Sequence, residues 1–165
     1  MNIFKAMVPD KVVGSLKDLD LDDLKARGIN SLLLDFDNTL GPDHATEPTD
    51  FSYEIVKNAR EHGFDMCLVS NAKSGRSDGI ARKLDIPCVT YAHKPRPDGV
   101  NRALALLGKD KSEAAMIGDQ VFTDVIAGKY AGVYTVFTEK YEKKEIWYIV
   151  LKRPFEKLVR LIAGF

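Results

Sequence analysis

The stretch Asn30-Ser-Leu-Leu-Leu-Asp-Phe-Asp-Asn-Thr-Leu40 decides the fold, because in it a continuous apolar run ends at two acidic residues. Residues 30–36 predict a buried strand. Strands that are apolar on both faces occur in parallel sheets covered by helices on each side. Asp35 and Asp37 then mark the carboxyl end of this strand, and a loop containing Gly and Pro follows it.

Short apolar runs and helical patterns alternate along the rest of the chain. Further strands are predicted at residues 64–70, 87–91, 114–118 and 133–137. Helices are predicted at residues 49–62, 76–84, 97–107 and 123–130, with helical flanks at 21–27 and 142–162. This alternation indicates an α/β fold, a doubly wound, Rossmann-like parallel sheet of about five strands with helices on both faces. No repeat or long linker interrupts it, so residues 1–165 are expected to form a single domain with its core at about 30–138.

The composition is that of an ordinary globular protein. The 165 residues are 45% apolar and 29% charged, and a chain of this length buries a core without disulfides. Cys67 and Cys88 lie in apolar runs and are interpreted as buried thiols of a reducing compartment. Residues 1–10 lack the apolar stretch of a signal peptide, and the longest run of aliphatic and aromatic residues, 146–151, is too short for a membrane span. A cytoplasmic location is expected.

The net charge of zero is distributed unevenly. Residues 140–165 carry seven Lys/Arg against three Glu, and residues 1–17 carry three Lys against one Asp. The middle of the chain is therefore acidic. An acidic body with basic ends is a pattern that an anionic partner can recognise.

Polar side chains follow four of the predicted strands at the point where each strand ends. In chain order they are Asp35 and Asp37, then Ser70 and Asn71, then Lys94, then Asp119 with Asp124 in the next helix. In open parallel sheets, ligands bind beyond the carboxyl ends of the strands. Ionisable groups brought to this edge from four separate segments indicate a functional site.

The acidic residues favour a hard divalent cation. Positions i and i+2 of an extended segment face the same side, so the carboxylates of Asp35 and Asp37 can reach one site. With Asp119 and Asp124 they would repel one another without a cation, and a small number of oxygen ligands suits Mg²⁺. Mg²⁺ also neutralises charge when a carboxylate approaches a phosphate dianion. The sequence therefore predicts Mg²⁺-dependent phosphoryl transfer.

The predicted roles follow from this chemistry. Asp35 is the predicted nucleophile and would form an aspartyl-phosphate intermediate. Asp37 is placed to protonate the leaving oxygen and then to deprotonate the hydrolytic water. Hydroxyls and loop amides would bind the phosphoryl oxygens, and Lys94 would add a positive charge. The predicted phosphate-binding residues are Thr39, Ser70, Asn71 and Lys94.

Each motif alone has a structural interpretation. A lone Asp-x-Asp is more often a turn or a helix cap, Ser70-Asn71 a turn and Lys94-Pro95 an exposed loop. Asp119 alone would be a capping residue, and Asp124 a residue of a first helical turn. Their joint occurrence, in order and each near a strand end, favours the functional interpretation.

These motifs resemble those of the haloacid dehalogenase-like (HAD) phosphatase superfamily. Asp35-Phe-Asp-Asn-Thr39 is similar to its first motif, Asp-x-Asp-x-Thr, and residues 118–124 are similar to its fourth, Gly-Asp-x4-Asp. Ser70 and Lys94 match the second and third. An Asp at position 37 points to phosphoryl transfer rather than dehalogenation.

The resemblance also implies the metal site. Asp35, Asp119 and the main chain of Asp37 would hold Mg²⁺, with Asp124 supporting the ion. No insertion long enough for a cap domain separates the motifs, because Ser70 follows Asp35 by only 35 positions and Lys94 follows Ser70 by only 24. A capless site suits a phosphate carried on a lipid surface or a macromolecule, or closure by a partner subunit in an oligomer.

A closer resemblance is to the YqeG family, capless subfamily III phosphatases related to mitochondrial-type phosphatidylglycerophosphate phosphatases. It is carried by Lys-Ala-Arg-Gly-Ile-Asn at 25–30, Ser70-Asn71, Tyr-Ala-His-Lys-Pro at 91–95 and Gly-Asp-Gln at 118–120. His93 stands where Arg is expected and Ala72 where Asn is common. The resemblance implies a phospholipid head group, that of phosphatidylglycerophosphate, as substrate and a role in phospholipid metabolism.

Alternative functions remain open at this point. The enzyme alternative is a phosphatase of a soluble sugar, nucleotide or protein phosphate. The others are a receiver-like signalling domain, which shares the fold, the Asp cluster, Mg²⁺ and the Lys, and a binding scaffold with an inactive site. Asp37 favours turnover over phosphate storage because it can activate water. No nucleic-acid partner is expected.

The C-terminal segment carries a basic amphipathic pattern. Its apolar stripe is Phe155, Leu158, Val159 and Ile162, and its flanking cations are Lys152, Arg153, Lys157 and Arg160. One interpretation is a helix packed on the sheet. The other is a helix resting on anionic lipid, which would make the protein peripheral at the inner membrane surface.

Overall fold

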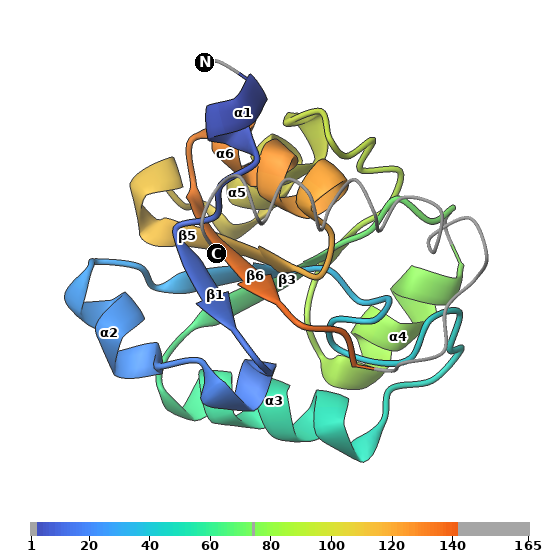
Figure 1. The fold of residues 1–165 in the computed structure, drawn as a ribbon. Helices are drawn as coiled ribbons and strands as arrows, with labels where there is room; N and C mark the ends of the chain where they lie inside the picture. The colour runs from blue at the N-terminus through green and yellow to red at the C-terminus, as the bar shows by residue number, and fades with distance from the viewer. Residues whose placement is uncertain (1–2, 74, 142–165) are drawn as a thin grey trace.

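A six-stranded sheet forms the centre of the protein in the computed structural model, which describes residues 3–73 and 75–141 (Figure 1). The strand order is β1-β6-β5-β2-β3-β4, and every neighbouring pair is parallel. The strands are β1 (Lys11–Val13), β2 (Ser31–Leu34), β3 (Asp65–Val69), β4 (Cys88–Val89), β5 (Ala114–Gly118) and β6 (Tyr134–Thr138). The predicted doubly wound α/β fold is confirmed, and the five predicted strands correspond to β2 through β6.

Helices connect the strands and cover both faces of the sheet. They are α1 (Ile3–Ala6), α2 (Leu21–Ala26), α3 (Asp50–Glu61), α4 (Arg76–Leu84), α5 (Asp98–Leu107) and α6 (Ile126–Ala131). Short 3₁₀ turns lie at Leu16–Asp18 and Lys111–Glu113, and a π-helical turn at Val121–Val125 precedes α6. Figure 1 shows α3 and α4 on one side of the sheet and α5 and α6 on the other.

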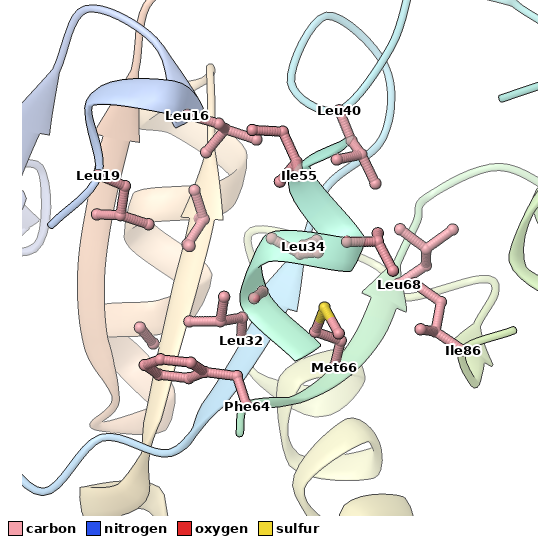
Figure 2. Close-up of a cluster of buried hydrophobic side chains, with 14 of the residues drawn as sticks. Leu16, Leu19, Leu32, Leu34, Leu40, Ile55, Phe64, Met66, Leu68 and Ile86 are labelled. Carbon is pink, nitrogen blue, oxygen red and sulfur yellow. The ribbon is translucent and has the colours of Figure 1, made fainter. Parts of the chain in front are cut away.

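Successive side chains of the central strands pack alternately into two separate hydrophobic cores, one on each face of the sheet. Leu32 and Leu34 of β2 pack with α2, α3 and α4 in one cluster, where Figure 2 shows them near Ile55 and Leu68. Leu33, between them in sequence, packs with α5 and α6 in the other cluster. All three leucines are buried. This burial on both faces explains why the β2 sequence is apolar without alternation.

The sixth strand, β1, was not predicted. It has three residues, one of them exposed, and within the described part of the chain it pairs only with β6, at an edge of the sheet. Lys11-Val-Val13 is too short to show a periodic pattern, so this strand depends on its tertiary partner. The predicted flank at 21–27 is confirmed as α2, whereas the predicted helix at 142–162 lies outside the described residues.

The order of the strands places a crevice at the carboxyl ends of β2 and β5. From β2 the chain moves outward to β3 and β4, then returns to β5 on the other side of β2 and continues to β6. β2 and β5 therefore flank the point where the strand order reverses, which is where open α/β sheets bind ligands. No cap domain covers this edge within residues 3–73 and 75–141, and none of the helices there is long and apolar enough to cross a lipid bilayer.

Candidate active site

The loop after β2 fixes the first two acidic residues. The Asp35 N–H donates to the carbonyl of Ile117 at 3.0 Å, so the β2–β5 ladder continues up to this residue. The next turn closes on the Phe36 carbonyl, which accepts from the N–H groups of three residues, Thr39, Leu40 and Gly41. A Cβ on Gly41 would lie 2.6 Å from the Phe36 ring, so a side chain there would open the turn.

Three buried carboxylates meet at the end of β2 and β5. The ligand oxygens of Asp35, Asp119 and Asp124 all lie within 4.8 Å of one another. Asp124 reaches the cluster from the π-helical turn, where its Oδ2 accepts from the Gln120 N–H at 3.1 Å. Gly118 permits this approach, because a Cβ at that position would lie 2.3 Å from the Asp124 carboxyl carbon. The Gly-Asp-x4-Asp motif therefore supplies two carboxylates of the cluster, Asp119 and Asp124, and the glycine that leaves room for the second.

Lys94 brings a buried ammonium between two of these carboxylates. Its Nζ lies 2.6 Å from Asp35 Oδ1 and 2.7 Å from Asp124 Oδ1, and its side chain is 2% exposed. Burial disfavours the charge on Lys94, but the carboxylates of Asp124 and Asp35 outweigh it and hold the pKa of Lys94 above its usual value. For Asp35 burial is the largest effect, and it raises the pKa of this carboxyl to about 7 despite Lys94.

The donor set fits a hard divalent metal ion. Three carboxylates share two ammonium groups, that of Lys94 and that of Lys140, whose Nζ lies 4.0 Å from Asp119 Oδ2. When all three carboxylates are ionised, the cluster therefore has an excess of negative charge in a buried place, which costs free energy unless a further cation compensates it. Carboxylate oxygens in this number are the ligands that such cations prefer.

The predicted phosphate-binding side chains surround this cluster in different ways. Ser70 Oγ accepts from the Ala72 N–H and from the Ser77 hydroxyl, each at 3.1 Å, which leaves its own proton outside these two bonds. Asn71 bonds to the main chain of Lys94 through both of its polar atoms. Thr39 is buried, and its hydroxyl donates toward Asp119 at 3.5 Å.

The Asp37 carboxylate is held by Arg76 and is not one of the three clustered carboxylates. Both of its oxygens accept from the guanidinium of Arg76, and Oδ1 also accepts from the His44 N–H at 3.1 Å. Its side chain still lines the same pocket as Asp35 and Lys94. Asp37 is thus near the cluster without belonging to it.

The pocket over the strand ends has a volume of about 420 Å³. Six of the eight predicted site residues line it: Asp35, Asp37, Ser70, Asn71, Lys94 and Asp124. Thr39 and Asp119 lie beneath it as buried residues. Sequence reasoning missed its other lining residues, which are Asp43, His44, Ala72, Arg76, Gln120 and Thr123. Of these, Ala72 and Gln120 lie in stretches compared with the YqeG family above, and Arg76 is a cation at the start of a predicted helix.

Residues 18–132 match the family of haloacid dehalogenase-like hydrolases. The match spans more than half of the chain and includes the whole pocket. The chain belongs to the haloacid dehalogenase-like hydrolases.

Relatives of this hydrolase are phosphatases by name. It is 31% identical to the probable phosphatase YqeG of Bacillus subtilis over 132 residues, which are 80% of this chain and 77% of that protein. It is 26% identical to phosphatidylglycerophosphate phosphatase 1 of Arabidopsis thaliana over 155 residues, 87% of this chain, and spans 44% of that protein's length. With its family, these relatives make the hydrolase a phosphatase.

Solved structures share the fold of this hydrolase. The cobalt-bound deoxy-D-mannose-octulosonate 8-phosphate phosphatase of Haemophilus influenzae aligns with a TM-score of 0.56 at 13% identity, covering 85% of this chain and 92% of that one. A putative subfamily III A hydrolase of the superfamily from Legionella pneumophila aligns with a TM-score of 0.50 at 16% identity, covering 87% of each chain.

Proposed function

We propose that this hydrolase cleaves a phosphomonoester through an aspartyl-phosphate on Asp35, with Mg²⁺ as its metal ion. The observation that carries the proposal is the position of Asp35. Its carboxylate lines the pocket, contacts the Lys94 ammonium and belongs to the carboxylate cluster. A nucleophile that attacks a phosphate needs positive charge beside it, and this arrangement provides it.

The residues that would hold Mg²⁺ are the carboxylates of Asp35 and Asp119 and the main chain of Asp37, with Asp124 in support. When bound, the ion would offset the negative charge of these carboxylates and of the phosphoryl oxygens. One Asp124 oxygen pairs with Lys94 and the other with the Gln120 N–H, so Asp124 is well placed to orient neighbours.

The proposed reaction has two steps on the same carboxylate. In the first, which starts with the Asp37 carboxyl protonated, an Asp35 oxygen bonds to phosphorus while the bond to the leaving oxygen breaks, and Asp37 gives that oxygen its proton. In the second, water attacks the phosphorus of the acyl phosphate, Asp37 takes the water's proton, and inorganic phosphate leaves with Asp35 restored. The Ser70 proton, which neither of the two Ser70 hydrogen bonds described above uses, would bind a phosphoryl oxygen, with Thr39, Asn71 and Lys94 in the same predicted set.

A phospholipid head group is the substrate we favour, in the form of phosphatidylglycerophosphate. The Arabidopsis relative carries that activity in its name. The absence of a cap among the described residues leaves the pocket accessible to a substrate anchored elsewhere. The Tyr141 N–H donates to the Asn38 carbonyl at 2.7 Å, so Tyr141, which precedes the basic segment 142–165 in the sequence, lies beside the loop after β2. These features support contact with an anionic membrane surface.

The test is a panel of phosphomonoesters with the purified protein and Mg²⁺, including phosphatidylglycerophosphate in mixed micelles and soluble sugar, nucleotide and peptide phosphates. Hydrolysis should disappear in excess chelator and in Asp35→Asn, because the amide is neither a nucleophile nor an anionic ligand. Full turnover by Asp35→Asn would refute the mechanism. Preference for a soluble phosphate over the lipid would refute only the substrate.

A further inference from the structure

Arg76 and Asp37 form a bidentate ion pair at the edge of the pocket. Arg76 Nη1 donates to Asp37 Oδ1 at 2.7 Å and Nη2 donates to Asp37 Oδ2 at 2.5 Å. Nη1 also donates to the carbonyl of Ala45 at 3.0 Å, which anchors the guanidinium to the loop after β2. A planar guanidinium that meets both oxygens of a carboxylate fixes the plane of that carboxylate as well as its position.

Helix stability does not explain an arginine at this position. Arg76 is the first residue of α4, where the positive end of the helix dipole disfavours a cation. The usual anionic contribution to a helix start comes instead from Asp78, whose Oδ2 accepts from the Gly75 N–H at 3.1 Å. The hydrogen bonds to Asp37 raise the pKa of Arg76 above its usual value, so the guanidinium keeps its charge. The partner that accounts for Arg76 is Asp37.

The pair leaves one particular oxygen of Asp37 for proton transfer. A carboxylate oxygen can accept about two hydrogen bonds. Among the residues that the structure describes, Oδ1 accepts two, from Arg76 and from the His44 N–H, whereas Oδ2 accepts one, from Arg76. Oδ2 therefore retains the acceptor position that a transferred proton needs.

We infer that Arg76 is a positioning residue for the acid/base Asp37 and that Oδ2 of Asp37 is the oxygen that exchanges protons with the leaving group and with water. The inference rests on the proposed function, in which Asp37 moves a proton in both steps. Arg76 itself touches no reacting atom in this scheme. It acts by holding the Asp37 carboxylate in one plane, since misplacement of a catalytic group by about 1 Å can cost roughly 10²-fold in rate.

The experiment is a double-mutant cycle of Arg76→Ala and Asp37→Asn, read as kcat and KM on aryl phosphates whose leaving groups range from acidic to basic. Arg76→Ala should lower kcat about 10- to 100-fold for basic leaving groups and much less for acidic ones, with little change in KM. Asp37→Asn should show the same trend with a loss of roughly 10²–10⁴-fold. Adding Arg76→Ala to Asp37→Asn should cost nothing further, because the acid that Arg76 positions is already gone.

Two further variants separate positioning from general stability. Arg60→Ala removes another arginine that joins two helices, through its bonds to the carbonyls of Leu84 and Asp85, and it lies outside the pocket. It should lower the melting temperature and leave kcat unchanged. Arg76→Lys, which keeps the charge but not the planar fork, should restore only part of the activity, and so should millimolar methylguanidinium added to Arg76→Ala.

The outcomes distinguish this inference from the proposed function. If Asp37→Asn loses activity as stated but Arg76→Ala costs the same factor in its background, Arg76 acts independently and the inference is wrong while the mechanism stands. The inference is also wrong, with the mechanism intact, if Arg76→Ala slows all leaving groups equally. If Asp37→Asn has no effect on any substrate, the acid/base role fails and the inference fails with it.

Discussion

Asn71 holds Lys94 by both sides of its main chain. The Lys94 N–H donates to Asn71 Oδ1 at 2.8 Å, and Asn71 Nδ2 donates to the Lys94 carbonyl at 3.0 Å. This clamp matters because Lys94 follows a two-residue edge strand and a loop in which Tyr91 and His93 have positive φ angles. Without it, little regular structure would fix the ammonium that contacts Asp35.

Asn71→Ala should therefore impair catalysis through Lys94. It removes both hydrogen bonds and leaves the Lys94 amide groups to find other partners, at a cost of about 1–3 kcal/mol in the free energy of unfolding. We expect kcat/KM to fall roughly 10²-fold because Lys94 is displaced. Asn71→Asp, which keeps the acceptor and loses the donor, should lie between Asn71→Ala and the parent. Parent-like kcat/KM in Asn71→Ala would show that Lys94 is held by other contacts.

Gly118→Ala should disrupt the carboxylate cluster, because residue 118 packs directly against Asp124. The added methyl would meet the Asp124 carboxylate at 2.3 Å and push it from the Gln120 N–H and from Lys94. We expect a loss of about 1–3 kcal/mol in stability from overpacking and at least a roughly tenfold higher Mg²⁺ requirement. Thermal melts and Mg²⁺ titrations of activity measure the two effects.

Gly79→Ala in α4 is the matched control for that variant, because a Cβ there meets nothing within 4 Å. It should stabilise the protein by up to about 1 kcal/mol and leave the Mg²⁺ requirement unchanged. An equal Mg²⁺ dependence in the Gly118 and Gly79 variants would contradict the role given to Gly118.

Mg²⁺ should stabilise the protein more at pH 8 than at pH 5.5. Burial raises the pKa of Asp35 from 3.8 to about 7 in the metal-free protein, so between these values the folded state binds the proton more tightly than the unfolded state. The stability contributed by this proton falls as pH rises through that window. Mg²⁺ requires the carboxylate, so at pH 5.5 it must displace the proton and at pH 8 it need not.

Differential scanning calorimetry with and without Mg²⁺ at the two pH values measures this linkage. The rise in melting temperature should be several degrees larger at pH 8, on the scale of roughly 4 °C or less per kcal/mol for a domain of this size. Asp35→Asn lacks the titrating group and should lose the difference between the two pH values. Equal Mg²⁺ shifts in the parent protein at both pH values would show that Asp35 is ionised throughout.

The basic C-terminal segment should mediate binding to anionic vesicles. Each Lys or Arg near such a surface contributes about 1 kcal/mol, so binding should weaken as salt rises. Replacing its four flanking cations, Lys152, Arg153, Lys157 and Arg160, by Gln should reduce cosedimentation with vesicles and hydrolysis of micellar lipid phosphate, and spare a soluble aryl phosphate.

The control is a second variant that also loses four positive charges, but at exposed positions that do not line the pocket. The exposed cations Lys17, Lys57, Arg82 and Lys83 suit this purpose, because none of them lines the pocket. Replacing these four by Gln should leave vesicle binding close to that of the parent. If the C-terminal variant binds and turns over lipid as well as the parent does, the segment has no membrane role.

Helices and strands were predictable where the pattern of apolar residues within one segment specifies the element. The range predicted for α4, residues 76–84, is its observed range, because its apolar spacing is regular. The strand predicted at 87–91 shortens to β4, since Tyr91 adopts a left-handed conformation that no strand continues. The helix predicted from residue 123 begins at 121 as a π-helical turn, a distinction that apolar periodicity does not carry.

The candidate site also has a part that was predictable from the sequence and a part that was not. The predicted cluster at the strand ends follows from topology alone, and the structure brings Asp35, Asp119 and Asp124 together. The partner of Asp37 was not predictable, because Arg76 lies 39 positions away and the pair depends on how α4 meets the loop after β2. No local pattern specifies a contact of that range.

The site residues follow both central and edge strands of the sheet, and this difference has a consequence for how the enzyme loses activity. The carboxylates follow β2 and β5, which have neighbours on both sides, whereas Lys94 follows β4, a two-residue strand at the margin. Marginal strands open in local fluctuations far below the free energy of global unfolding. Such an opening would withdraw the ammonium and leave the carboxylates in place. Turnover should then be lost reversibly at denaturant concentrations where circular dichroism is still native, and amide hydrogen exchange should be faster along β4 than along β2.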